Sequence, residues 1–545
     1  MTHILLRIQL IILFGILVPV HNLLAQFPVP SIYENDQPVK CLTPSIIYSQ
    51  TSGSKNAQEI RSSLSEILDS NISNIELYLS PSGRFLLNYT RSGTDAVPTL
   101  DQNNNNIPDY IEQAALFADE SYAILVQELG YTDPTIPGVP YEIRFRQINS
   151  YGFTQSAGIT SFIVVHRNFE GFPSNNDPSG DVIGALKVTI AHEFKHAIQY
   201  AVNRWQGNTG SVSWVEMDAT MIEEVVYPEV DDYLNYLNTC VSSACSVIRD
   251  PNRSTPGSYY HATWMLFFQH HIGPDFWVDV WSDIQANPSG AQMFELIRKQ
   301  LRLRGLDYTT EFTRNHLWHL ASGNRSIDGY GFPDASRFPN TALQQTAIIA
   351  DSLKALPEQS RHRAAQYVEV SNLDRQFGEL LVELNFTVGS VGLGLLALDQ
   401  NGEVIEIIES GNRIDNNGFF RISTGILTER TTYLAMVVSN PDEFDQDISF
   451  TLSARELPEF ITLSNNFPNP FNPVTTIPFS IPENSHVRLV VYDIQGRVVS
   501  ELVNQSLSAG FYDVKVNAAG WSSGVYLYSL QTSSDTRTGK MLLLK

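Results

Sequence analysis

The sequence predicts a multidomain protein in which an α+β domain is followed by two all-β sandwich domains. The chain has 545 residues, whereas a single hydrophobic core rarely grows beyond about 250–300 residues. Residues 99–358 alternate helical stretches with short strands and hold most of the histidines and tryptophans. From residue 365 onward the apolar residues follow a period of two, with Asn, Gly and Asp turns between them. That pattern indicates half-buried strands.

The charge balance of the chain restricts its partners. The sequence contains 35 Lys and Arg residues against 58 Asp and Glu, which gives a formal net charge of -23. Such an excess of negative charge repels nucleic-acid phosphates and anionic lipid surfaces. We therefore expect no nucleic-acid partner.

The first 25 residues have the pattern of a secretory signal peptide. Arg7 precedes an apolar run over residues 8–20, and Ala25 is a small residue before a polar one. These are the charged region, the apolar core and the cleavage site of such a peptide. A membrane anchor is the alternative, but the run is shorter than the ~20 residues that span a bilayer. We expect cleavage near Ala25 and no integral membrane segment afterwards, because no later segment is long and apolar enough.

Three cysteines fit an oxidising compartment. Cys240 and Cys245 are close enough in sequence to close a small disulfide loop, which leaves Cys41 as the third cysteine.

Residues 26–98 form an N-terminal segment that we interpret as a pro-segment or an opening hairpin. A helical pattern covers about residues 56–69, and two strands, 75–80 and 84–89, flank the turn Pro81-Ser82-Gly83.

The C-terminal region divides into two blocks of alternating strands, residues 365–456 and 460–545. In the second block, Asn466-Phe-Pro-Asn-Pro-Phe-Asn-Pro473, Tyr492-Asp-x-x-Gly-Arg497 and Gly524-Val-Tyr-Leu-Tyr528 follow in order. Residues 463–545 thereby resemble the C-terminal sorting domain of proteins exported by the type IX secretion system. The resemblance implies a partner, the type IX machinery, and a secreted or outer-surface location. An ordinary carbohydrate-binding or adhesive sandwich is the alternative.

A candidate metal site lies in the segment His192-Glu193-Phe194-Lys195-His196. Gly180-Asp181 precedes a predicted helix over residues 182–202, so both histidines project from one helix face, one turn apart. Their nitrogens can occupy two adjacent corners of a Zn²⁺ tetrahedron, and Glu193 then reaches the open corner as a general base. Two solvent-facing histidines on an amphipathic helix are the alternative.

A second predicted helix, residues 214–224, supplies a third ligand. Its pattern Trp-x-Glu-x-x-Ala-Thr-x-x-Glu, with Glu216 twenty residues after His196, resembles the second zinc-binding helix of the gluzincin peptidases. The resemblance implies a zincin-like metallopeptidase domain with Glu216 as the third zinc ligand. Glu223, two turns further on, is either a partner of a ligating histidine or a solvated carboxylate.

Gluzincins commonly stabilise the oxyanion with a Tyr or His from a later helix. The resemblance therefore makes Tyr259 or Tyr260 a catalytic candidate, because both precede an apolar helix over residues 263–268. Packing of both tyrosines against that helix is the alternative.

The strand over residues 158–165 lacks the acidic segment with which aminopeptidase relatives bind a free amine. It can pair with an extended peptide by strand addition. We therefore expect a secreted zinc endopeptidase acting on protein or peptide substrates. The competing class is an inactive zincin scaffold at the cell surface that binds glycan or protein through its sandwiches.

A second metal site is predicted between residues 101 and 112. The segment places oxygen ligands in the register of an EF-hand-type Ca²⁺ loop, with Asn106 at the usual glycine position. The expected ligands are Asp101, Asn103, Asn105 and Glu112, with the Ile107 carbonyl and with Asp109 acting directly or through water. An Asn-rich turn that caps a helix over residues 110–129 is the alternative.

The segment Lys40-Cys41-Leu42-Thr43-Pro44 is similar to the cysteine-switch segments of other zincin propeptides. In such segments a thiolate occupies the open zinc position, as its softness and charge allow. An ordinary thiol without that role is the alternative.

Overall fold

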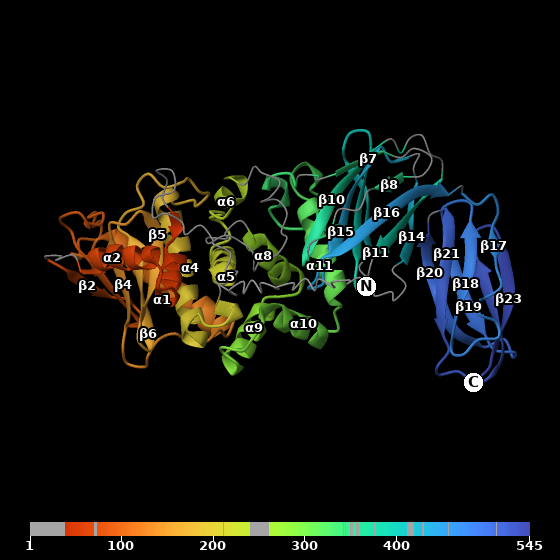
Figure 1. Cartoon of the computed structure of the whole chain (residues 1–545), viewed down its shortest axis with the longest axis horizontal. Helices are drawn as coiled ribbons and strands as arrows, with labels where there is room; N and C mark the ends of the chain where they lie inside the picture. The colour runs from red at the N-terminus through yellow and green to blue at the C-terminus, as the bar shows by residue number, and fades with distance from the viewer. Residues whose placement is uncertain are drawn as a thin grey trace, which may run out of the picture.

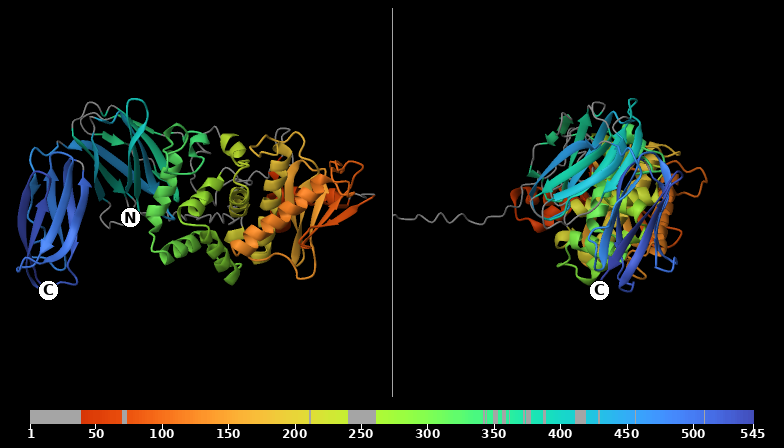
Figure 2. Two further views of the ribbon diagram at one scale, coloured as in Figure 1. Left: turned by 180° about the vertical axis from the view of Figure 1, so that it is seen from behind. Right: turned by 90° about the vertical axis from the view of Figure 1, so that its right-hand side faces the viewer.

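A computed structural model describes the chain from residue 39 to residue 545, with gaps. The gaps are residues 70–73, 211, 240–260, 342, 344, 349–352, 356–358, 361, 372, 374–377, 387–388, 411–418, 428–429, 456 and 508. A mixed α/β region is followed by two all-β parts along the long axis of the molecule (Figures 1 and 2). The multidomain prediction is thus confirmed at this level. The expected signal peptide and the Cys240–Cys245 disulfide lie outside the described residues.

The mixed region is built on one six-stranded sheet with the order β1-β5-β6-β4-β3-β2. Strands β3, β4 and β6 are parallel, β5 runs antiparallel to β6, and β1 pairs in parallel with β5. The predicted hairpin is present as β2 and β3, but it belongs to this sheet. The domain boundary expected at residue 98/99 therefore divides strands of a single sheet. The strands are β1 (Val39–Cys41), β2 (Glu76–Leu79), β3 (Phe85–Tyr89), β4 (Tyr141–Arg146), β5 (Ser150–Ala157) and β6 (Thr160–His166).

Helices surround this sheet and extend away from it toward the β region (Figure 1). The predicted helices over residues 56–69, 182–202 and 214–224 are confirmed as α2, α4 and α5. The one expected over residues 110–129 is α3, which continues as the π-helix η1. The helices are α1 (Thr43–Thr51), α2 (Lys55–Asp69), α3 (Asp109–Tyr122), η1 (Ala123–Glu128), α4 (Asp181–Asn203), η2 (Asn208–Gly210), α5 (Val212–Val226), α6 (Leu234–Thr239), α8 (Ala262–His271), α9 (Asp275–Ala286), α10 (Met293–Leu303), α11 (Tyr308–Leu320), η5 (Gly323–Arg325) and η6 (Ala335–Arg337).

Helix α4 is the central element of the mixed region. It packs against β5 and β6 on one side and against α3, α5 and α9 on others, so nearly all of its side chains are buried. A helix buried all round is normally apolar. The middle of α4 instead carries buried ionisable residues, which cost free energy unless they are paired or bind a cation. They are His192, Glu193, Lys195 and His196.

The first all-β part consists of two sheets that share one core. Their orders are β13-β12-β15-β10-β7 and β14-β11-β16-β8, with β9 also paired to β16. Strands β7, β8 and β9 belong to this sandwich, whereas the sequence had placed residues up to 358 in the preceding domain. The strands are β7 (Gln345–Ile348), β8 (Leu353–Ala355), β9 (Gln359–Ser360), β10 (Ala364–Ser371), β11 (Glu379–Phe386), β12 (Gly392–Leu398), β13 (Val404–Ser410), β14 (Phe419–Leu427), β15 (Tyr433–Asn440) and β16 (Gln446–Arg455).

The second all-β part is a smaller sandwich at the C-terminal end of the molecule (Figure 2). A three-stranded sheet, β17-β18-β21, faces a four-stranded sheet, β20-β19-β22-β23, across a separate core. Its strands are β17 (Thr462–Leu463), β18 (Val474–Ile481), β19 (Ser485–Tyr492), β20 (Val498–Leu507), β21 (Gly510–Asn517), β22 (Gly524–Gln531) and β23 (Thr536–Leu543).

Helix α11 joins the mixed region to the first sandwich. Leu317 and Leu320 share a buried cluster with Leu396 of the sandwich. The Thr313 hydroxyl lies 2.8 Å from that of Ser439, within hydrogen-bonding distance. In the described part of the chain, no helix is long and apolar enough to cross a membrane.

The close packing of β5 on α4 leads to a stability prediction. A Cβ added at Gly152 would lie 2.9 Å from both Thr189 Cγ2 and the Val164 carbonyl oxygen, and 3.0 Å from Glu193 Cγ. We expect Gly152→Ala to destabilise the mixed region by about 1–3 kcal/mol, because overpacking forces its neighbours apart. Differential scanning calorimetry of the full chain measures the effect. Gly53→Ala is the control, since nothing lies within 4 Å of its added Cβ; equal transitions in both variants would contradict the packing.

Candidate metal centre

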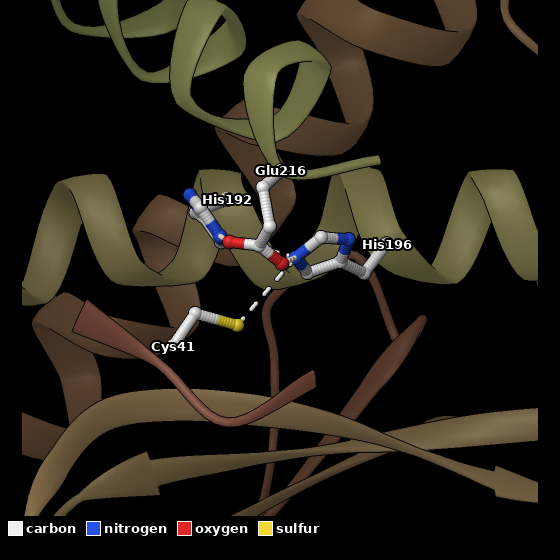
Figure 3. Close-up of side chains that lie close together, drawn as sticks. All are labelled: Cys41, His192, His196 and Glu216. Carbon is white, nitrogen blue, oxygen red and sulfur yellow. Dashed lines mark hydrogen bonds and ion pairs between the residues drawn. The ribbon is translucent and has the colours of Figure 1, made fainter. Parts of the chain in front are cut away.

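The three predicted zinc ligands lie together between α4 and α5 (Figure 3). Nε2 of His192 and Nε2 of His196 are 3.1 Å apart, as the one-turn spacing on α4 requires. The Glu216 carboxylate of α5 faces both rings, with Oε1 2.9 Å from His196 Nε2 and Oε2 3.5 Å from His192 Nε2. All three side chains are buried.

Each imidazole is oriented through its other nitrogen. Nδ1 of His192 lies 2.7 Å from Glu223 Oε1, which favours the histidine-partner role of Glu223 over a solvated carboxylate. Nδ1 of His196 lies 2.8 Å from Gln199 Oε1. Gln199 in turn donates to Asp218 Oδ2 at 2.7 Å. Such partners fix the ring and direct Nε2 toward a metal.

Gln199 and Asp218 are functional candidates that the sequence reasoning missed. Gln199 is the third residue after His196, so the 3.6-residue period of α4 places both on neighbouring positions. The spacing of Gln199 from His196 could therefore have identified Gln199 from the sequence. The contact of Gln199 with Asp218 could not, because it depends on the packing of α5 against α4.

The donor set fits a divalent cation. Both carboxylate oxygens of Glu216 are buried and face imidazole nitrogens, at 2.9 Å from His196 Nε2 and 3.5 Å from His192 Nε2. A buried carboxylate needs a positively charged partner, which a protonated imidazole or a cation can supply. Two imidazole nitrogens and one carboxylate oxygen are the ligands of many catalytic zinc sites, so His192, His196 and Glu216 would hold Zn²⁺ here.

The charges within the site perturb its pKa values. Burial alone would raise the pKa of Glu216, but His196 and His192 outweigh it and lower this pKa to about 2. Burial alone would lower the pKa of His192, but Glu216 and Glu223 outweigh it and raise this pKa to about 10. The carboxylate and the imidazoles thus stabilise each other's charged forms.

Glu193 is buried beside the ligands and contacts two hydroxyl groups. The Thr154 hydroxyl donates to its Oε2 at 2.9 Å, and the Thr43 hydroxyl lies 3.3 Å from the same oxygen. Burial raises the pKa of Glu193, and the neighbouring His196 and His192 oppose that shift. A carboxylate with a raised pKa is better matched to accept a proton near neutral pH.

Cys41 is a fourth candidate ligand in the same cluster (Figure 3). Its Sγ lies 3.5 Å from His196 Nε2, and its side chain is buried. The four donor atoms of Cys41, His192, His196 and Glu216 all lie within 4.8 Å of one another. Burial, together with Glu193 and Glu216, raises the pKa of the Cys41 thiol well above its ordinary value.

The strand predicted to pair with a substrate peptide is not available for pairing. Residues 158–165 correspond to β6, which is paired on both sides by β5 and β4, so strand addition there is wrong. The next strand outward from β6 is β5, which runs antiparallel to β6 and packs on α4, and β1 already pairs with its other side. Tyr259 and Tyr260 lie outside the described residues.

The predicted calcium loop is organised by its own side chains. Asp101 accepts hydrogen bonds from the backbone of Asn105 and Asn106, and Asn106 adopts the expected left-handed conformation, with φ 69°. The Glu112 carboxylate accepts from the amides of Asn103 at 2.9 Å and Asn105 at 2.6 Å.

Two further predicted ligands of this loop lie differently. The Ile107 backbone amide donates to Asn105 Oδ1 at 2.8 Å. Both oxygens of Asp109 accept from the Gln102 backbone amide. The amide nitrogens of Asn103 and Asn105 face the Glu112 carboxylate, whereas their oxygens accept from the backbone amides of Asn105 and Ile107.

A separate acidic group is formed by Glu224, Asp231 and Asp334. Arg337 forms ion pairs with Asp231 and Asp334, which accounts for their proximity.

Comparison with known proteins identifies the C-terminal sandwich. Residues 465–544 match the family described as "Secretion system C-terminal sorting domain". The predicted sorting domain is confirmed, and the chain is thus directed to the type IX secretion machinery and to the outer surface or exterior of the cell. No curated protein matches the chain.

Solved structures with partial similarity include two β-glucuronidases. One is from Faecalibacterium prausnitzii, with 12% identity over 33% of this chain and 37% of that chain and a TM-score of 0.12. Another, from Ruminococcus gnavus in complex with N1-substituted uronic isofagomine, has 9% identity over 33% and 36% and a TM-score of 0.13. This chain spans only about a third of their lengths, and TM-scores this low carry no argument about fold or function.

The role of Glu223 can be tested through metal affinity. We expect Glu223→Gln to weaken zinc binding roughly 10- to 100-fold, because the His192 ring loses the carboxylate that orients it. Competition with a chromophoric chelator on the full chain measures the affinity. Glu224→Gln is the matched control, one residue further on α5, and should bind zinc like the wild type. Equal affinities in all three proteins would exclude the role of Glu223.

Proposed function

We propose that the chain is a secreted zinc-dependent endopeptidase with a zincin-like metallopeptidase domain. The observation that carries the proposal is the buried convergence of His192, His196 and Glu216. A general-base candidate, Glu193, is adjacent to His192 in the chain and contacts Thr154. A surface protein without catalysis has no need for a buried carboxylate beside a ligand set of this kind.

The protein residues have separate roles in the proposed hydrolysis. A zinc ion supplies Lewis acidity, which lowers the pKa of water and polarises a carbonyl group. Glu193 accepts the proton of the attacking water at its carboxylate and returns it to the departing amine nitrogen. The Thr154 hydroxyl holds the Glu193 carboxylate in place, and Glu223 and Gln199 hold the two imidazoles.

An internal peptide bond is the favoured substrate. An exopeptidase that binds a free amine needs an acidic partner near the site. Strand β5, which packs on α4, contains no Asp or Glu over Ser150–Ala157. Its side away from β6 is paired only with the three-residue strand β1 within the described residues, and displacement of β1 would let its main chain pair with an extended polypeptide of many sequences.

The competing function is an inactive scaffold that binds glycan or protein through its sandwiches. The buried pair of Glu193 and Thr154 favours the enzyme, because a scaffold would gain stability by losing a buried charge.

Substitution of Glu193 separates catalysis from metal binding. We expect Glu193→Gln to retain zinc and to reduce casein hydrolysis by roughly 100- to 10,000-fold, the usual contribution of a general base. Zinc content and hydrolysis are measured on the full chain, before and after limited trypsin treatment. Glu128→Gln, an exposed carboxylate on η1, is the control. Hydrolysis that survives in Glu193→Gln at the wild-type rate would refute the mechanism.

We further propose that the loop over residues 101–112 binds Ca²⁺. The amide groups of Asn103 and Asn105 lie 2.9 Å and 2.6 Å from the Glu112 carboxylate. Rotation of these amides would turn their oxygens toward the same point, which supports the proposal because Ca²⁺ takes carboxylate and amide oxygens. Two neutral ligands imply weak affinity, on the order of the millimolar range of extracellular modules.

The calcium proposal predicts a ligand-dependent stability. Millimolar CaCl₂ should raise the thermal transition of the wild type relative to EDTA, because the ion binds only the folded loop. Glu112→Gln should abolish this shift, and Glu128→Gln should retain it. A Ca²⁺-independent transition in the wild type would instead assign the loop to helix capping.

A further inference from the structure

We propose that residues 39–51 form an inhibitory plug in which Cys41 closes the zinc site and β1 occupies the substrate-binding edge of β5. The inference rests on the proposed peptidase function, whose regulation it describes. The plug comprises β1 (Val39–Cys41), residue 42 and α1 (Thr43–Thr51).

The first contact is at the metal ligands. Cys41 Sγ completes a group of four donor atoms with His192, His196 and Glu216, all within 4.8 Å of one another. Four protein ligands complete a tetrahedron, and closed tetrahedra characterise structural zinc sites, whereas catalytic sites keep one position open. Zinc held by these four residues would bind Cys41 as its thiolate, with the thiol proton passing to solvent, and would keep no protein-free position for water.

The second contact is at the proton acceptor. The Thr43 hydroxyl lies 3.3 Å from Glu193 Oε2, the oxygen that Thr154 also holds. The backbone amide of Thr154 donates to the Thr43 hydroxyl at 2.9 Å. The plug thus occupies the space beside the general base as well as the open ligand position.

The third contact is with the sheet. Strand β1 pairs in parallel with β5, with Val39 opposite Ser150 and Cys41 opposite Gly152. The Leu42 amide donates to the Gly152 carbonyl oxygen at 3.1 Å. A backbone group engaged by β1 cannot also pair with a substrate strand, so an extended peptide and the plug exclude each other.

Lys40 anchors the plug from the far side of His192. Its ammonium group is buried and forms ion pairs with Glu223, at 2.7 Å, and with Asp232. The same ammonium lies 4.8 Å from the ring centroid of Tyr151. A buried ammonium needs such partners, so Lys40 fixes the register that places Cys41 at the metal ligands.

The apolar side of α1 adds to this anchor. Leu42, Ile46 and Ile47 are buried in one cluster with Phe153 and Trp205. Burial of this extent holds the plug in place until the chain is cut or the segment is displaced. The described state is accordingly the closed state of the enzyme.

Cobalt substitution tests the thiolate contact without reference to activity. The full chain loaded with Co²⁺ should show a thiolate-to-cobalt charge-transfer band in the near ultraviolet. We expect Cys41→Ser and Cys41→Ala to lose this band while they retain the visible bands of bound cobalt. Ser45→Ala, in the same segment, is the control and should keep both. Absence of the charge-transfer band in the wild type would overturn the proposal.

Casein hydrolysis by the zinc forms of the same proteins tests the inhibition. We expect hydrolysis to rise on the order of 10- to 100-fold in Cys41→Ser, if the plug leaves roughly 1–10% of wild-type molecules open. A wild type as active as Cys41→Ser would overturn the plug and leave the peptidase intact. If every form, including trypsin-treated chain, is inactive although the band is present, the peptidase function fails and Cys41 is a ligand of a structural zinc site.

Discussion

The buried carboxylate of Glu216 between two imidazoles is the interaction on which the rest of the site depends. It lies where α5 packs on α4, and its two oxygens face the Nε2 atoms of His196 and His192. Without a positive charge beside it, a carboxylate buried at such a position would destabilise the fold. If zinc binds as proposed, it would link folding with function, because the ion would stabilise the packing of the two helices and the packing would define its ligands.

Glu223 and Gln199, which orient the two imidazoles, connect the site to residues farther from it. Glu223 holds the His192 ring and also pairs with Lys40, so one carboxylate connects the metal ligands with the N-terminal segment. Gln199 connects His196 to Asp218 of α5. These links explain why α4 tolerates His192, His196 and Gln199 in its buried middle, because each of them has a polar partner in the same network.

Local patterns in the sequence predicted most of the helices and strands and the ligand set. The four-residue spacing of the histidines and the period-two strands are properties of neighbouring residues, so they can be recognised without a fold. Long-range pairing cannot be recognised in this way, and there the predictions failed. Strands β2 and β3 pair within the main sheet, β7 and β8 pair within the first sandwich, and β6 is an internal strand. The contact of Gln199 with His196 could have been predicted from their spacing of three residues on one helix. The contact of Lys40 with Asp232 could not, because it depends on tertiary packing.

Helix α11 has a consequence for the molecule as a whole. Its face toward the first sandwich is fully apolar where Leu317 meets Leu396, and His316 adds a contact of 2.8 Å to the Tyr367 hydroxyl. An interface buried in this way transmits force and strain between its two sides as a packed core does. The mixed region and the first sandwich would then move as one unit, so that the residues of the candidate metal site keep a fixed orientation relative to this sandwich.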